Sequence, residues 1–439
     1  MRISHYLLFT VLASSPSVPA AAETLEEAWQ VAVGNNYRLK AAQADTQSSE
    51  HQLEAAQGQQ WPTLIVSGGY TQYSDSIVSN TNFSSQSVQT SSGPVLVDGG
   101  NVQFKTAQQG SAKTQAIVSA PLFTSGRINA NIDAATAMLN AMQASENAMV
   151  MDIKMQVAES FIAVLRAEKL VQVARSHADN LDAHARNVKS LYEQGMESRN
   201  ESLASEVEAT NAQQELLQKN HQLDDAKMQY NALLARELSE PVVLATTLPK
   251  KPQGALETLS DTALQERSEL ASMAGRIDSY FQQAESVKAE NLPQLNLNGG
   301  YVYQQNAYQL HQGMWMMGVD VQWRLFDATT GHRSEAFTKQ AYVLKAQYDE
   351  LANQVKLQVR QSWLAVEETQ QRVAVTEKSV SQAEENKRIV VENYKEGLAT
   401  SSEVLHAEEL QVKSHANLDQ ARYDAALAIL RLRRSVGVL

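Results

Sequence analysis

Hydrophobic residues recur every seven positions along a stretch that runs from Arg127 to Tyr192 without a proline or a glycine. One series consists of Val150, Val157, Val164, Val171, Ala178, Ala185 and Tyr192, and the second, three positions on, of Ile153, Ser160, Ala167, Ala174, Leu181 and Val188. Two such series form the a/d seam of a coiled coil. The predicted helix approaches ~100 Å in length, which is too long for a compact globular core. A returning helix is predicted from about Asn200 to Ala235.

Other stretches alternate between apolar and polar residues, which is typical of a β-strand. Leu64, Val66 and Tyr70 share one face of the stretch that begins at Thr63. A second alternating stretch places Ala116, Val118, Ala120 and Leu122 on one face. Between the two lie residues 71–112, which are rich in Ser, Thr, Gln, Asn and Gly and carry few charges. We therefore predict a strand hairpin over about 63–123 that encloses a long polar surface loop.

The whole plan then occurs a second time. Tyr192, Gly195, Ser198, Glu201, Leu203 and Glu206 reappear as Tyr394, Gly397, Thr400, Glu403, Leu405 and Glu408, each 202 positions later. The strand entry at Pro62 is matched by Pro293, and the strand exit Leu122-Phe123 by Leu325-Phe326. The heptad positions return as Ala352, Val359, Val366, Val373 and Val380, with Lys387 in place of Ala185. Because helix, strand and turn all repeat in register, the chain is predicted to be a tandem repeat.

The repeat fixes the predicted domain boundaries. A signal peptide is expected over 1–22, because Arg2 precedes an apolar stretch and Ala20-Ala21-Ala22 offers a cleavage site. The first repeat covers 23–240, with a helix to residue 60 broken near Gly34, the strand hairpin of about 63–123 and a helical hairpin of about 127–236. A connector spans 241–257. The second repeat covers 258–439, with a helical segment over 258–290, a strand hairpin of about 294–326 and a helical hairpin of about 333–434.

The predicted strands have the length of membrane-spanning β-strands. Each alternates over about ten residues, and a transmembrane strand needs about 9–11. One face carries aromatic residues such as Tyr70, Tyr301, Tyr303 and Trp323, while the other carries Asp320, Gln322 and Arg324, which are candidates to line a wet lumen. Four strands cannot close a barrel, so a membrane-spanning sheet would have to be shared among copies of the chain. The alternative is a small soluble antiparallel sheet over a core.

Composition excludes several classes of function. The chain has 49 acidic and 37 basic residues, a net charge of −12, which argues against nucleic acid or an anionic lipid surface as a partner. It has no cysteine, so no lipid-bearing cysteine follows the signal. No apolar run reaches the ~20 residues of a membrane helix. His177 and His184 lie seven apart without a third ligand at metal-binding spacing. No nucleophile elbow, phosphate loop or zinc motif occurs, so we expect no enzyme, no cofactor and no metal site.

These motifs together resemble the TolC-like outer-membrane efflux proteins. The resemblance covers nearly the whole mature chain and rests on Thr24-Leu25-Glu26-Glu27-Ala28, on the paired strand entries and exits, and on the two Tyr-x-x-Gly turns. It implies a mainly α fold with a β-barrel: a trimer in which long helical hairpins form an α-helical barrel below a shared 12-stranded transmembrane β-barrel. It also implies an outer-membrane location with a periplasmic extension. The partners it implies are a periplasmic adaptor and an inner-membrane transporter, which supplies the energy for export.

The resemblance also points to candidate site residues at the two turns. Candidates for the periplasmic gate are Glu201, Glu403, Tyr192, Tyr394 and His406, and candidates for contact with the adaptor are Gly195, Gly397, Met196 and Leu398. For the glutamates and the tyrosines a purely structural role is the alternative. Ser198 with Glu201, and Thr400 with Glu403, fit capping boxes that start a helix, and the tyrosines fit heptad packing positions. Some relatives carry an arginine just after the turn glycine that links to the tyrosine, whereas this chain has Ala399.

Two other functions fit part of the pattern. A trimeric coiled-coil surface fibre would account for the long helices but has no use for duplicated strands with one lipid-like face. A soluble periplasmic adaptor would need one helical hairpin rather than two. The sequence therefore favours an outer-membrane exit duct for efflux or type I secretion, whose cargo and cognate pump it does not identify.

Overall fold

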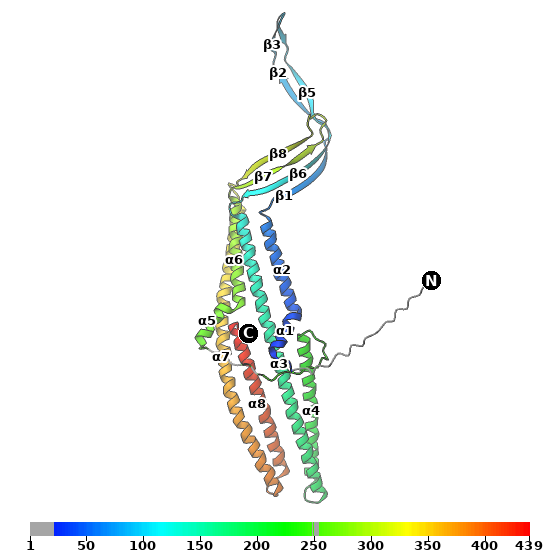
Figure 1. Cartoon of the computed structure of the whole chain (residues 1–439), viewed down its shortest axis with the longest axis vertical. Helices are drawn as coiled ribbons and strands as arrows, with labels where there is room; N and C mark the ends of the chain where they lie inside the picture. Colours follow the sequence, from blue (N-terminus) through cyan, green and yellow to red (C-terminus); the bar gives the residue numbers. More distant parts are fainter. Residues whose placement is uncertain (1–21, 248, 250–253) are drawn as a thin grey trace, which may run out of the picture. The chain divides into compact units, whose positions relative to one another are not determined.

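A computed structural model of the chain describes residues 22–247, 249 and 254–439 (Figure 1). The predicted signal peptide lies outside the described residues, apart from residue 22. The chain divides into two compact units. The helical unit comprises the chain up to residue 45, residues 142–272 and residues 347–439, and the sheet unit comprises residues 46–141 and 273–346.

Two long helical hairpins dominate the helical unit, as the heptad pattern predicts. Helix α3 (Arg127–Glu193) returns as α4 (Arg199–Leu233), and α7 (Ala328–Lys395) returns as α8 (Ser401–Val436). The two turns lie at the same end of the unit (Figure 1). Val157, Val164 and Val188 of the α3 seam are fully buried. Among the described residues, no helix combines the length and the apolar character needed to cross a membrane.

Shorter helices precede each strand hairpin. Helix α1 (Leu25–Asn35) is followed by α2 (Tyr37–Gly58), with the break at Asn36, close to the predicted one. The segment 258–290 is helical, as predicted, but it is divided into shorter helices. This segment contains α5 (Leu256–Glu266), α6 (Ser268–Lys288) and the 3₁₀ turn η1 (Ala289–Asn291). The break falls at Arg267, whose backbone is extended and whose side chain is buried among polar partners.

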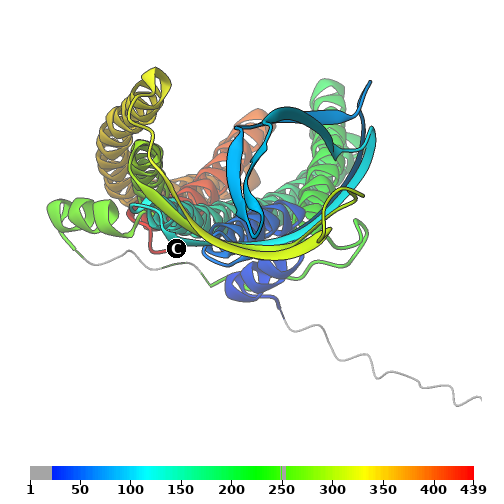
Figure 2. The ribbon, with the colours of Figure 1, turned by 90° about the horizontal axis from the view of Figure 1, so that it is seen from above.

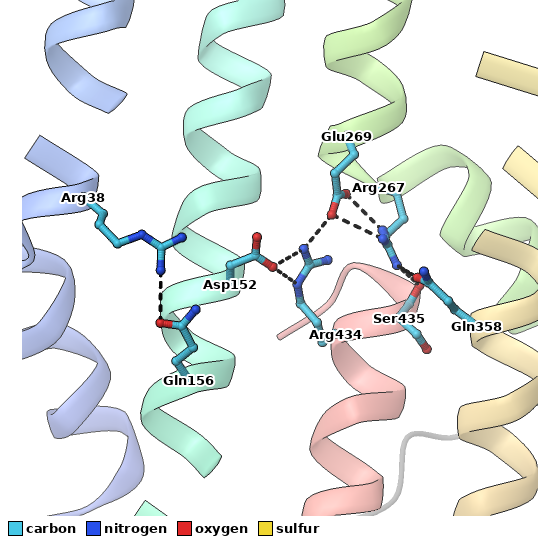
Figure 3. Close-up of polar contacts among 8 residues, drawn as sticks. All are labelled: Arg38, Asp152, Gln156, Arg267, Glu269, Gln358, Arg434 and Ser435. Carbon is cyan, nitrogen blue, oxygen red and sulfur yellow. Dashed lines mark hydrogen bonds and ion pairs between the residues drawn. The ribbon is translucent and has the colours of Figure 1, made fainter. Parts of the chain in front are cut away.

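Polar contacts around Arg267, at the end of α5, connect it to α6 and α8, and α8 is connected in turn to α3 (Figure 3). Arg267 pairs with Glu269 at 3.0 Å and donates to the backbone carbonyl of Ser435 at 3.2 Å. Arg434 of α8 bridges the carboxylates of Glu269 on α6 and Asp152 on α3. Since both guanidinium groups are largely buried, they must be paired, and the pairing holds the end of α8 against its neighbours.

The sheet unit contains one antiparallel four-stranded sheet. Its strands are β1 (Thr63–Gln72), β6 (Gly110–Phe123), β7 (Gln294–Gln304) and β8 (Gly313–Gln322), in the order β1-β6-β7-β8. The central pairing of β6 with β7 joins the two repeats. Figure 2 shows the four strands side by side in one curved layer.

The register of the sheet aligns the predicted faces. Leu64 pairs with Val118, Leu297 pairs with Ala120 on one side and with Val319 on the other, and Tyr301 pairs with Trp315. Residues directly opposite each other in a sheet point to the same face. The apolar positions of the two repeats therefore form one continuous apolar face across all four strands.

The polar stretch 71–112 is not a simple loop, contrary to expectation. It holds β2 (Ile77–Phe83), which pairs with β5 (Gly100–Ala107), and β3 (Gln86–Thr90), which pairs with β4 (Gly93–Val97). In β5, Val102 and Phe104 alternate with polar residues as in a strand, while β2 and β4 carry adjacent apolar residues. We call residues 77–107 the ribbon.

Candidate functional site

The two hairpin turns share one backbone geometry. Gly195 and Gly397 have φ angles of 76° and 73°, a left-handed conformation that favours glycine. The amide of Met196 donates to the carbonyl of Leu191 at 2.8 Å, and the amide of Leu398 makes the equivalent bond in the second turn. This pattern closes a helix end and leaves the next side chain in solvent: Met196 is 62% exposed and Leu398 is 74% exposed.

The two returning helices begin with different caps. At Thr400 the capping box is complete, because the threonine hydroxyl accepts from the amide of Glu403 and the glutamate accepts from the amide of Thr400. These hydrogen bonds from Thr400 lower the pKa of Glu403. At Ser198 only the first half forms, from the amide of Glu201 to the serine hydroxyl. The prediction of two capping boxes is thus confirmed for Glu403 and half confirmed for Glu201.

Tyr394 links the two turns. Its hydroxyl donates to Glu197 at 3.1 Å, from the end of α7 to the first turn. Burial and the neighbouring Glu197 carboxylate raise the pKa of Tyr394 to about 12, so the phenol stays protonated and remains a donor. Its counterpart in the first repeat, Tyr192, is 40% exposed. A cavity of about 600 Å³ lies between the turns, and Glu197, Glu201 and Tyr394 help to line it.

His184 forms a second link between the hairpins. Its Nε2 lies 2.9 Å from the hydroxyl of Ser401 at the start of α8. Its ring lies 5.8 Å from the ring of Tyr394, at a tilt of 55°. Burial lowers the pKa of His184, and the carboxylates of Glu408 and Glu197 oppose this shift. His184 is therefore a structural contact whose strength depends on its protonation.

A buried charged cluster forms the third link, further from the turns. Glu408 of α8 is only 4% exposed and forms an ion pair with Lys387 of α7. The other oxygen of Glu408 accepts from Asn180 of α3 at 2.7 Å. Lys387 also donates to Gln411 at 2.8 Å. The heptad pattern marks Lys387 only as an interruption at the position of Ala185 and does not reveal the cluster.

His406 lies apart from these links. Its side chain is 70% exposed, and its Nδ1 is 3.9 Å from Glu409, one turn further along α8. This contact lies within α8 and does not join the two hairpins. In the described parts of the chain, no group of three or more His, Asp or Glu side chains could hold a metal ion.

The candidate lumen residues divide into two sets. Asp320 and Gln322 lie on β8, and Asp320 accepts a hydrogen bond from Asn298 on β7. Arg324 does not belong to the strand, contrary to prediction, because β8 ends at Gln322. Its guanidinium lies 3.4 Å from Glu290, which also pairs with Arg333 at 3.1 Å. The ion pair, rather than the strand alternation, determines where Arg324 points.

Comparisons with known proteins agree with this architecture. The family model described as "Outer membrane efflux protein" matches residues 28–236 and 259–438. The outer membrane protein TolC of Vibrio cholerae is 26% identical over 314 residues, covering 65% of this chain and 67% of that protein. The alkaline protease secretion protein AprF of Pseudomonas aeruginosa is 23% identical over 305 residues, covering 66% of this chain and 62%, less than two thirds, of its own length. The solved structure of CusC superposes with a TM-score of 0.76 at 15% identity, covering 94% of this chain and 92% of that one.

Proposed function

The chain belongs to the outer membrane efflux protein family and is an exit duct of the outer membrane, and from this premise we propose that three copies form one channel. The observation that carries the proposal is the four-stranded sheet. Among the described strands, none pairs with the outer edge of β1 or of β8. In hydrocarbon each unpaired backbone group costs several kcal/mol. Three copies give 12 strands, enough to close a barrel around an open lumen.

The two faces of the sheet suit such a barrel. The apolar face carries Val319 and Val321, which are 55% and 69% exposed, and Trp315, which is 81% exposed. Exposed apolar side chains of this kind are stable against lipid tails and costly against water. The opposite face of β8 carries Asp320 and Gln322, which suit a wet lumen. The duct itself is passive, and we propose that a partner transporter in the inner membrane supplies the energy.

We propose that the two turns receive the periplasmic adaptor. They present Met196 and Leu398 to solvent at the end of each hairpin. Exposed apolar side chains held on rigid turns are suited to act as anchors for a partner protein. Gly195 and Gly397 fix how these side chains project.

Replacing both anchors with glutamate tests adaptor docking. Met196→Glu/Leu398→Glu is expected to lower adaptor affinity by about 30-fold or more, because charge buried without a partner costs about 2–5 kcal/mol at an interface. Resistance conferred on a strain lacking its own duct should fall, while the conductance of the purified protein in planar bilayers stays unchanged. The matched control is Met196→Leu/Leu398→Met. Full resistance in the glutamate variant would place the adaptor contact elsewhere.

Glu201 and Glu403 are proposed to form a carboxylate ring at the entrance. Three copies would bring six carboxylates near one axis, which favours cations. Glutamine can occupy the capping position as glutamate does, so Glu201→Gln/Glu403→Gln removes charge and preserves the helix start. We expect the ratio of cation to anion permeability in bilayers to fall toward unity. Thr400→Ala, which removes the cap and keeps the charge, should retain selectivity. If the cation selectivity of the glutamine variant is unchanged, Glu201 and Glu403 do not form a selective ring and act only at the helix starts.

We propose that the links between the two hairpins, among them the contact of His184 with Ser401, hold the entrance closed, and that acid loosens the His184 contact. Burial lowers the pKa of His184 below 6.5 in the closed contact, so a proton binds more tightly once the ring meets water. The stabilisation of the closed form is complete above pH 6.5 and is lost as the pH falls through the lowered pKa. Bilayer conductance should therefore rise on acidification. His184→Gln can keep a hydrogen bond to Ser401 without titrating, and should show a smaller rise. Equal pH responses in the two proteins would exclude His184 as the cause.

A further inference from the structure

The ribbon is the largest difference between the two repeats. The loop between β7 and β8 runs from residue 305 to residue 312, whereas residues 73–109 separate β1 from β6. Within the longer segment, β2 and β5 pair with each other in a sheet of their own, and β3 and β4 do the same. The duplicated plan of strand, turn and strand does not require this addition.

The register gives the β2–β5 pair two unlike faces. Ser79 pairs with Phe104, Thr81 with Val102, and Phe83 with Gly100, which puts two phenylalanines and a valine on one face. The alternate pairs are Val78 with Lys105, Asn80 with Gln103 and Asn82 with Asn101, so the second face is mainly polar, with four amide side chains, one lysine and one valine. Phe83, Val102 and Phe104 are 58%, 48% and 46% exposed. The ribbon is therefore amphipathic, and its apolar face is uncovered in a single chain.

An isolated two-stranded ribbon with an open apolar face is at best marginally stable in water. It needs either further strands or a surface to pack on. Figure 2, which looks down the long axis, shows the ribbon on the concave side of the curved sheet. If three copies close a barrel, the concave side faces the lumen, where there is no lipid to cover an apolar face.

We propose that the ribbons of three copies pack their apolar faces against one another across the outer mouth of the channel and narrow it. This inference rests on the proposed trimer. β2 follows β1, the edge strand at which a neighbouring copy would join the sheet, so the ribbon begins beside the interface between copies. Asp75, Asp98 and Lys105 are the charged residues of the segment 73–109. Because identical charges repel, a nearly uncharged ribbon is suited to meet its own copies.

Disulfide trapping tests the contact, since the chain has no cysteine of its own. Val102→Cys and Gln103→Cys are neighbours on β5 that point to opposite faces. A disulfide needs Cα atoms within about 7 Å. We expect Val102→Cys to give covalent dimers on oxidation in outer membranes, and Gln103→Cys to stay monomeric on a denaturing gel. Phe104→Cys, on the apolar face two residues on, should behave as Val102→Cys does.

The native mass of each variant in mild detergent separates this inference from the proposed function. A trimeric mass with dimers at residues 102 and 104 supports the packing of the ribbons. A trimeric mass without these cross-links, or with cross-links at residue 103 alone, overturns it and leaves the duct intact. A monomeric mass overturns the proposed trimer as well. Protection of Val102→Cys from maleimide in membranes without any cross-link would indicate that lipid covers the face, and would also overturn the inference.

Discussion

Replacing Lys387 with methionine is expected to destabilise the helical unit by about 3 kcal/mol. Glu408 would be left buried without its counter-charge, and breaking a buried pair by removing one partner costs about 3–5 kcal/mol. The lower end applies because Asn180 still donates to the carboxylate. The opposite change, Glu408→Leu, should cost less, because the Lys387 side chain is 22% exposed and can turn to water.

The double variant Lys387→Met/Glu408→Leu is the matched control. It removes both charges and fills the space with apolar groups, which is often neutral or stabilising. Thermal unfolding followed by the helical circular dichroism signal should therefore rank Lys387→Met lowest and the double variant near the parent protein. If the stability loss of the double variant equals the sum of the losses of the two single variants, the buried pair does not act as a unit.

Replacing Tyr394 with phenylalanine is expected to shift the entrance from closed toward open by about 10- to 150-fold. The change removes a hydrogen bond from the tyrosine hydroxyl to the charged Glu197 carboxylate, and such bonds contribute about 1.5–3 kcal/mol. The ring and its contact with His184 remain, so the effect isolates the hydroxyl. Single-channel recording in planar bilayers measures the open fraction directly.

Tyr192→Phe is the control that the repeat itself provides. Tyr192 occupies the equivalent position in the first hairpin, but its side chain is 40% exposed. Removing the hydroxyl of Tyr192 should therefore leave the open fraction of the channel unchanged. If Tyr192→Phe opened the channel as much as Tyr394→Phe, or if neither did, the link from Tyr394 to Glu197 would have no part in closing the entrance.

The features that the sequence predicts well are periodic or local. The α3 seam follows from seven-residue spacing, the turns follow from Gly195 and Gly397, and the sheet follows from alternation repeated in two halves. Each depends on residues that are near one another in the chain. The register of the sheet then aligns the two repeats, because the paired strands bring their apolar residues to the same face.

The features that the sequence does not predict depend on distant partners. Nothing near Lys387 in the sequence indicates that its partner Glu408 also accepts a hydrogen bond from Asn180. Asn180 belongs to the other hairpin and lies 228 positions from Glu408. The break at Arg267 contains neither proline nor glycine, and its cause is the set of polar groups around the guanidinium. The strands of the ribbon do not stand out in the sequence, because Ser, Thr, Asn and Gln separate most of their apolar residues.

The proposed channel is built from three copies of the chain. Its most direct test is single-channel recording in planar bilayers of detergent-purified mature protein whose native mass is measured in the same preparation. We predict a mass three times that of the chain, and a cation-selective conductance that is small in the parent protein and larger in Tyr394→Phe. A monomeric mass, with no channel formed by the parent protein or by Tyr394→Phe, would contradict the trimeric channel.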